Sequence, residues 1–363
     1  MMQQAKTPEF SIPGAKGGPG ATVRKVDVGI VGVTGYTGQE LLRLLLGHPG
    51  ARITFLAAGG KSDPGKVLRH FGRLGVPVTP FDEEGCARAC GAVFLCLPHE
   101  ASMEAVPGLL KKGVRVLDMS AAFRLKDPAL YESAYKFTHA FPSLLAKAVY
   151  GLPEVHGARL RGARLIAVPG CYPTGAILAV APLLAKGWAR GRVIADSKSG
   201  VTGAGHDAKP DLMYCEVNDN FKAYGVFNHR HHPEMAQEMS ALARRPVDLV
   251  FTPHLVPMNR GILSTVYLTL DKARTREAVL AAYKARYGRC PFVRVLEEGL
   301  PDTRGVRGTN FCDIGVAVRG RDVIVVSAID NLVKGAAGEA VQSFNLSQGF
   351  PETTGLPGAA GAP

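Results

Sequence analysis

Short apolar runs alternate with helical stretches between residues 26 and 117, and this alternation constrains the fold more than any other feature of the chain. The runs are rich in β-branched residues, as strands are. Apolar strands separated by helices form a parallel sheet with right-handed crossovers. The pattern predicts a Rossmann-like α/β domain, with a helix at 39–46 and strands at 26–31, 52–58, 92–97 and 114–117.

The alternation weakens after about residue 165, where longer strand-like runs follow one another. These runs span 247–251, 264–270, 313–318 and 323–328. Such a succession predicts an α+β domain with a mostly antiparallel sheet. A chain of 363 residues is also long for a single core.

The expected domain organisation follows from this change. We expect a dinucleotide-binding domain at 24–165 and a catalytic and substrate domain at 166–329. A final helix within 330–350 is expected to pack back on the first domain. Residues 1–23 are rich in Gly, Pro, Gln and Lys and are expected to form a disordered tail.

Composition favours a cytoplasmic protein that handles anions. No apolar run approaches the roughly 20 residues of a membrane helix, and no secretory signal layout is present. Seven widely spaced cysteines indicate reduced thiols. The net charge of +12 fits phosphorylated small molecules as well as nucleic acid, and no nucleic-acid module accompanies it.

A glycine-rich segment lies between the first expected strand and the first expected helix. Glycines let such a turn tighten and let backbone amides approach a diphosphate at the helix N-terminus. A plain strand-to-helix turn is the alternative interpretation, but the order strand, glycines, helix favours dinucleotide binding. The candidate contacts are Gly32, Thr34, Gly35, Tyr36, Thr37 and Gly38.

The end of the second strand favours NADPH over NADH. Proteins that bind NAD usually carry an acidic residue there for the ribose hydroxyls. Here the segment reads Ala-Ala-Gly-Gly-Lys-Ser at 57–62, which offers Lys61 and Ser62 to a 2′-phosphate. The alternative is that Lys61 is a solvated loop residue.

Cys171 stands in a Pro-Gly-Cys-Tyr-Pro-Thr segment between a strand-like run at 164–168 and an apolar helix expected at 176–184. The positive end of a helix dipole lowers a thiol pKa and makes thiolate available. A thiolate there can attack an acyl carbon. A lone cysteine is more often a buried apolar residue, but the Pro-Gly elbow indicates that this one is presented.

The segment Asn-His-Arg-His-His-Pro-Glu at 228–234 clusters histidines before an expected helix. They could move a proton or bind an anion in a cleft. His229 and His231 also form an H-x-H pair, but no H-E-x-x-H motif or carboxylate cluster supports a metal site. We therefore expect no metal. The loop at 196–205, rich in small residues and hydroxyls, fits either a phosphate contact or a flexible connector.

With these motifs, residues 27–342 resemble the N-acetyl-gamma-glutamyl-phosphate reductases, the arginine-pathway family of the semialdehyde dehydrogenase superfamily. The resemblance rests on Gly-Tyr-Thr-Gly at 35–38, Tyr-Gly-Leu-Pro-Glu at 150–154, Pro-Gly-Cys-Tyr-Pro-Thr at 169–174, the 196–205 loop, His-Arg-His at 229–231 and the segments 251–261, 306–310 and 330–335.

The resemblance implies an NADPH-dependent oxidoreductase that forms an aldehyde from an acyl phosphate. Cys171 would form a thioester, with His229, or next His231, as the acid/base. Implied cofactor contacts include Ser199, Gly200 and Asn331. Implied substrate contacts are Arg124, Lys198, Arg230, Glu234 and Arg260. A homo-oligomer, dimer or tetramer, is also implied.

The chain departs from the family pattern at two positions. Ala122 stands where the family usually has an acid, and His206 where an arginine commonly follows Gly-Ala-Gly. Aspartate-semialdehyde dehydrogenase is the main alternative, followed by a reductase of carrier-linked aminoadipyl phosphate. A non-catalytic NADPH-binding regulator and a nucleic-acid binder are further alternatives.

Overall fold

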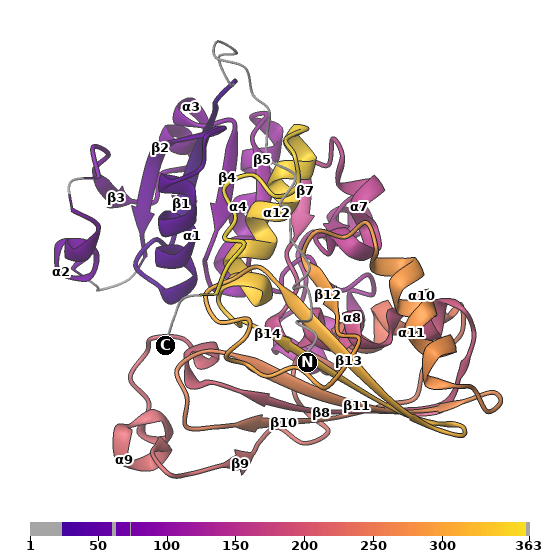
Figure 1. The fold of residues 1–363 in the computed structure, drawn as a ribbon. Coiled ribbons are helices and arrows are strands. Elements are labelled where there is room, and N and C mark those ends of the chain that lie inside the picture. Colours follow the sequence, from indigo (N-terminus) through magenta and orange to yellow (C-terminus); the bar gives the residue numbers. More distant parts are fainter. Residues whose placement is uncertain (1–23, 60–62, 73, 361–363) are drawn as a thin grey trace, which may run out of the picture.

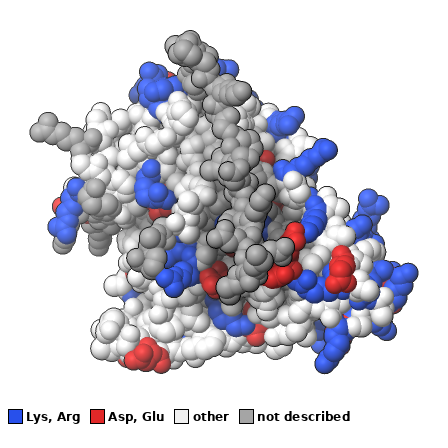
Figure 2. Space-filling view, viewed as in Figure 1, with Lys and Arg blue, Asp and Glu red and all other residues white. Residues whose placement is uncertain are grey.

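The computed structural model describes residues 24–59, 63–72 and 74–360 and contains two seven-stranded sheets (Figure 1). The tail expected at 1–23 lies outside the described residues. In the described part of the chain, no helix combines the length and apolarity that crossing a membrane requires. On the face in Figure 2, basic side chains are spread widely, with acidic ones among them.

The first sheet is entirely parallel, with strand order β3-β2-β1-β4-β5-β7-β6. This order reverses direction beside β1, which places a crevice at the carboxyl ends of β1 and β4. The predicted Rossmann-like class is confirmed. The strands are β1 Val26–Val31, β2 Ala51–Ala58, β3 Val78–Pro80, β4 Ala92–Leu95, β5 Arg115–Asp118, β6 Val149–Tyr150 and β7 Leu165–Ala167.

Helices cover both faces of this sheet because its strands are apolar on both sides. In β4, Phe94 packs with α1 and the C-terminal helix α12, whereas Val93 packs with α4. The helices of this part are α1 Tyr36–Leu46, α2 Pro64–Leu68, η1 Arg69–Phe71, α3 Glu83–Ala89, α4 His99–Lys111, α5 Ala129–Tyr135, α6 Pro142–Leu145 and α7 Pro153–Leu160, with the π-helical turn η4 Val333–Ala337 and α12 Gly338–Gln348 returning from the C-terminus.

The second sheet is mixed and mostly antiparallel, with order β12-β13-β14-β11-β8-β10-β9. One face of this sheet packs on the apolar helix α8. The opposite face is the lower one in Figure 1 and is open. The strands are β8 Ala189–Ser199, β9 Lys222–Ala223, β10 Leu249–Leu255, β11 Ile262–Leu270, β12 Val293–Val295, β13 Cys312–Arg319 and β14 Asp322–Ile329. The helices are α8 Cys171–Ala185, η2 Val201–Ala204, η3 Pro210–Leu212, α9 Tyr214–Val217, α10 His232–Ala243 and α11 Arg276–Tyr287.

Two helix boundaries differ from the expectation in ways that matter for the site. The helix expected from residue 176 begins at Cys171, because Pro173 is tolerated in a first turn, where its missing N–H costs nothing. The final helix expected as one piece begins instead with the π-helical turn η4. Such turns are frequent at functional sites.

Candidate active site

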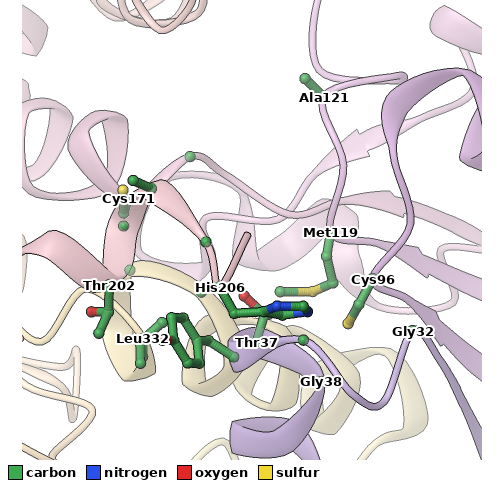
Figure 3. A pocket seen from close by; sticks show the side chains of 18 of the residues that line it. Gly32, Thr37, Gly38, Cys96, Met119, Ala121, Cys171, Thr202, His206 and Leu332 are labelled. Atoms are coloured by element: carbon green, nitrogen blue, oxygen red, sulfur yellow. The ribbon is translucent and has the colours of Figure 1, made fainter. Parts of the chain in front are cut away.

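Two cavities meet at Cys171, between the two sheets. The first, about 560 Å³, reaches from Cys171 to the glycine-rich turn after β1 (Figure 3). The second, about 490 Å³, extends toward Tyr224 and His229. Both are lined by Cys171, Gly203, Ala204, Arg230 and His231. A molecule in either cavity therefore has access to this cysteine.

The glycine-rich turn is tight, because a side chain at either of two of its positions would collide with neighbouring backbone. Gly32 has φ +84°, and a Cβ there would lie 2.3 Å from the Cys96 carbonyl oxygen. A Cβ at Gly38 would lie 2.3 Å from the Gly32 carbonyl oxygen. Gly35 begins α1 without a side-chain cap. The first N–H groups of α1 have no partner within the helix and can face an anion.

The structure places most of the predicted cofactor contacts along these cavities. The six residues predicted in the turn, together with Asn331, line the first cavity, and Ser199 and Gly200 line the second. Asn331 is held by two hydrogen bonds, accepting from the Gly261 N–H at 2.7 Å and donating to Thr202 Oγ1 at 2.9 Å. Lys61 and Ser62 lie outside the described residues.

Cys171 is the first residue of α8, at the mouth of the first cavity (Figure 3). Gly170 precedes it in an extended conformation, φ −70° and ψ 153°. The turn η4 packs against it from the other side: a Cβ on Gly335 would lie 2.9 Å from Cys171 Cβ. The elbow and η4 thus enclose the Cys171 backbone and Cβ from two sides.

A buried carboxylate fixes the elbow. Glu234, on α10, is fully buried and its Oε1 accepts from the Gly170 N–H at 2.8 Å and from Tyr150 Oη at 2.7 Å. Its Oε2 accepts from Arg124 Nη1 at 3.3 Å. Arg124 also donates to the carbonyls of Val168 and Met119. The network joins α10, β6 and the loop after β5 to the residue preceding Cys171.

Burial raises the pKa of the Cys171 thiol above its ordinary value. The Tyr172 N–H and the cations Arg124 and Arg230 oppose the rise, and Glu234 adds to it. The expected lowering of the thiol pKa by the helix terminus is therefore wrong for the free protein, because burial outweighs the favourable terms.

The two histidines occupy different environments. A Cβ on Gly170 would lie 2.6 Å from His231 Nε2, so this ring packs against the elbow. His231 Nδ1 is buried and has no hydrogen-bond partner among the described residues. His229 Nδ1 accepts from the His231 backbone N–H at 3.1 Å, which leaves its proton on Nε2 when the ring is neutral.

Both rings are neutral near pH 7. Burial, followed by the nearby Arg230, lowers the pKa of His229 to about 4. Burial also lowers the pKa of His231 well below its ordinary value, and His229, Arg124 and Arg230 lower it further. A neutral imidazole can accept a proton, and the His231 ring has a nitrogen free to do so.

Of the predicted substrate contacts, the structure brings only Arg124 and Arg230 to the cavities. Lys198 alternates with Ser199 along β8 and points to the opposite face, where its Nζ lies 2.6 Å from Asp196 Oδ1. Arg260 bridges Glu40 and Asp330 at 3.2 and 3.3 Å. Glu234 is fully buried. These three side chains line neither cavity and are held in ion pairs or in the elbow network, and their assignment to substrate stays a prediction.

Sequence reasoning missed His99, which begins α4 and lines the first cavity. Its Nδ1 accepts from the Ala121 N–H at 3.1 Å, so its proton lies on Nε2. Burial, with Arg230 and Arg124 nearby, lowers its pKa to about 4. Its position directly after β4, at the carboxyl edge of the parallel sheet, was the signal available in the sequence.

A doubly wound parallel sheet with a glycine-rich turn at its switch point, joined to a second sheet across a shared cleft, is typical of two-domain oxidoreductases with a dinucleotide-binding first domain. Among the described residues, no group of three or more His, Cys, Asp or Glu is arranged to hold a metal ion.

Comparison with known proteins identifies a family within this class. A family model described as the NAD binding domain of semialdehyde dehydrogenase matches residues 27–163, and one described as the semialdehyde dehydrogenase dimerisation domain matches 171–331. The chain is 51% identical to an N-acetyl-gamma-glutamyl-phosphate reductase of Geobacter sulfurreducens, over 93% of this chain and 99% of that one. It is 49% identical to the enzyme so named from Symbiobacterium thermophilum, over 91% and 97%.

Solved structures share the fold. An aspartate semialdehyde dehydrogenase II of Vibrio cholerae aligns with TM-score 0.67 and 18% identity, over 89% of this chain and 98% of that one. An aspartate semialdehyde dehydrogenase of Candida albicans, solved with NADP, aligns with TM-score 0.64 and 15% identity, over 89% and 98%. The chain belongs to the semialdehyde dehydrogenase family, among its N-acetyl-gamma-glutamyl-phosphate reductases.

Proposed function

We propose that this protein catalyses the NADPH-dependent reduction of N-acetyl-gamma-glutamyl phosphate to N-acetylglutamate semialdehyde, a step of arginine biosynthesis, through a thioester on Cys171. The observation that carries the proposal is the position of Cys171 where two cavities meet. A dinucleotide in the first cavity and an acyl chain in the second would both reach its sulfur. Residues 24–165 and 330–350 would hold the cofactor, and 166–329 the acyl chain.

Cys171 and His231 carry the covalent steps. His231 takes the thiol proton, the sulfur attacks the γ-acyl carbon, and the bond from that carbon to the phosphate oxygen breaks; the phosphate leaves and takes a proton from solvent. When bound, the nicotinamide supplies the hydride that reduces the thioester carbonyl. His231 returns its proton to the oxyanion, and breaking of the carbon–sulfur bond releases the semialdehyde and the thiol. Covalent capture divides a difficult reduction into easier steps.

The geometry favours His231 over His229 as the acid/base. His231 packs on Gly170 and lines both cavities, and its Nδ1 lacks a partner among the described residues. His229 lines the second cavity, and its Nδ1 already accepts a hydrogen bond. We assign His229 the role of donor, through Nε2, to the substrate carbonyl oxygen.

The leaving phosphate is assigned to the group formed by Arg124, Arg230 and His99. All three line the first cavity, and the two arginines influence the ionisation of Cys171. Arginine presents a planar fork suited to phosphate. His99 adds a neutral donor at Nε2.

NADPH is favoured as the cofactor because β2 ends without a carboxylate. The strand ends at Ala58, and Gly59 lines the first cavity. No acidic side chain there would repel a 2′-phosphate. The related Candida albicans structure is described with NADP.

Replacement of the nucleophile tests the proposal. Cys171→Ser should abolish phosphate-dependent NADP⁺ reduction with N-acetylglutamate semialdehyde while NADPH still binds. Cys215→Ser, at an exposed thiol, is the matched control and should keep full activity. Full activity of Cys171→Ser would refute the thioester, and failure to bind NADPH would indicate damage to the fold.

The same assay distinguishes the alternatives. Aspartate or aminoadipate semialdehyde as the better substrate would identify the enzyme as a relative acting on another acid. Absence of turnover with an unreactive Cys171 would favour a regulator that binds NADPH without catalysis. The names of relatives at about 50% identity favour the acetylglutamyl substrate.

We further propose a homodimer formed through the open face of the second sheet. Ile194, Tyr267 and Ile324 stand side by side across β8, β11 and β14, each 37–40% exposed. The family model matched here is described as a dimerisation domain. Tyr267→Asp should convert the oligomer to monomers in light scattering, and an unchanged mass would remove this face from the interface.

A cytoplasmic location is proposed from the cysteines. None of the seven forms a disulfide. Cytoplasmic thiols stay reduced, as a nucleophilic Cys171 requires. A thiol reagent added to cell extracts would test the reduced state. Once the protein is unfolded, all seven thiols should react.

A further inference from the structure

His206 reaches from the second domain to the glycine-rich turn of the first. It follows η2 and Gly205, which has φ +85°. Its ring meets that of Tyr36 edge-on, with centroids 5.9 Å apart. A Cβ on Gly35 would lie 3.9 Å from His206 Cδ2. Figure 3 shows the imidazole in the first cavity, which Thr37 and Gly38 also line.

The polar atoms of this ring are available to a ligand. The nearest acidic oxygen, Asp207 Oδ1, is 3.8 Å from His206 Nδ1, which exceeds hydrogen-bond distance. Among the described residues, no side chain or carbonyl accepts a hydrogen bond from the ring. The His206 side chain is 38% exposed. It therefore lies at the cleft with a donor to offer.

The ring also faces the part of the cleft where an anion is expected. Gly35 caps the eleven-residue helix α1 without a side chain, so backbone N–H groups are open there. The arginines that line the same cavity, Arg124 and Arg230, influence Cys171 at its other end. His206 therefore lies at the end of the first cavity near the glycine-rich turn, away from the end where Arg124 and Arg230 influence Cys171.

We infer that His206 donates a ring N–H to a phosphate oxygen of the dinucleotide and thereby closes the second domain over the glycine-rich turn. The inference rests on the proposed use of NADPH. It assigns to a residue outside the dinucleotide-binding domain part of the affinity for the diphosphate. A competing explanation is that His206 only packs on Tyr36.

Binding of NADPH, followed by its fluorescence at fixed pH and salt, separates the two explanations. His206→Phe keeps a ring against Tyr36 and removes the donor, and should weaken NADPH binding about tenfold, the value of a hydrogen bond to a charged group. His206→Arg should bind within about threefold of the wild type, with a steeper dependence on salt. Asp207→Asn removes a carboxylate that lines the same cavity 3.8 Å from His206 Nδ1, and should bind NADPH at least as tightly as the wild type.

Adenosine 2′-monophosphate, which lacks the diphosphate, is the second probe. Its affinity, measured by competition, should not change in His206→Phe. Wild-type affinity of His206→Phe for NADPH would overturn the inference, as would equal weakening of both ligands. Failure of the wild type to bind NADPH would instead refute the proposed cofactor.

Discussion

Replacement of Glu234 by Gln should loosen the elbow while making the thiol easier to ionise. Glutamine has the same shape, and its oxygen can keep the bonds from Gly170 N–H and Tyr150 Oη. Its NH₂ group would then face Arg124 Nη1, a donor, and leave a buried cation unpaired. Breaking a buried ion pair in this way costs about 3–5 kcal/mol. Arg124 keeps two carbonyl acceptors, so we expect the lower end, about 3 kcal/mol.

The effect on Cys171 has the opposite sign. The Glu234 carboxylate raises the pKa of Cys171, whereas Arg124 lowers it. Removal of the negative charge leaves the lowering effect of Arg124 and Arg230 without this opposing carboxylate, so the thiol pKa should fall. At pH 7.5 the Cys171 peptide should therefore be alkylated faster by iodoacetamide, as quantified by mass spectrometry. Turnover should decrease, because a displacement of about 1 Å at a reacting group can cost a hundredfold.

Glu238→Gln is the matched control. Glu238 lies one turn further along α10, is also buried, and pairs with His156 rather than with the elbow. It should leave the alkylation rate of Cys171 unchanged. Urea unfolding gives the change in stability. Slower alkylation in Glu234→Gln, or a loss of stability below about 1 kcal/mol, would refute the argument.

Three further predictions concern other parts of the molecule. Lys334→Met should lower the free energy of unfolding by about 3–5 kcal/mol in urea titration, because it leaves the buried carboxylates of Glu154 and Glu339 unpaired; a loss below about 1 kcal/mol would contradict this. His99→Ala should raise the KM for phosphate about tenfold in the semialdehyde-oxidising direction without changing NADPH affinity, and an unchanged KM would remove His99 from the phosphate site. Stability should fall as the pH decreases from 6.5 to about 4, since the unfolded chain binds protons on His99 and His229 that the folded chain, with pKa values of about 4, does not. Each histidine should contribute up to about 1.4 kcal/mol per pH unit, and the double replacement by asparagine should flatten the profile of unfolding free energy against pH.

The fold was predictable because its main signals are local. The run at 26–31 and the glycines after it fix a strand, a turn and a helix within about twenty residues. The strand order was not predicted, because it depends on which strands pair across the sheet and the handedness of crossovers does not fix it. The π-helical turn at Val333–Ala337 was not predictable, because the buried ion pairs of Lys334 that hold it depend on Glu154, about 180 residues away.

The basic and acidic site residues show why the rest of the site was harder to predict. The sequence shows that Lys198, Arg260 and Glu234 are charged, but it does not show which residue each side chain contacts. Lys198 pairs with Asp196, two residues away, whereas Glu40 on α1 and Arg260 in the segment between β10 and β11 come together only in the folded chain. The resemblance therefore placed all three among the predicted substrate contacts, and only the tertiary arrangement reveals that Glu234 and Arg260 pair with residues distant in the sequence.

The thiol illustrates a further limit of sequence reasoning. Helix position predicted a lowered pKa for Cys171, but the terms that decide it are burial and the competing charges of Arg124 and Glu234, which come from distant segments. Burial disfavours every charged form, so it holds the thiol neutral and the His231 imidazole neutral together. A resting site of two neutral groups does not form the reactive thiolate until proton transfer between them is favoured. The phosphate of an acyl phosphate bound beside the same arginines would oppose their effect on both groups: it would raise the pKa of Cys171, as Glu234 does, and it would make His231 a better proton acceptor.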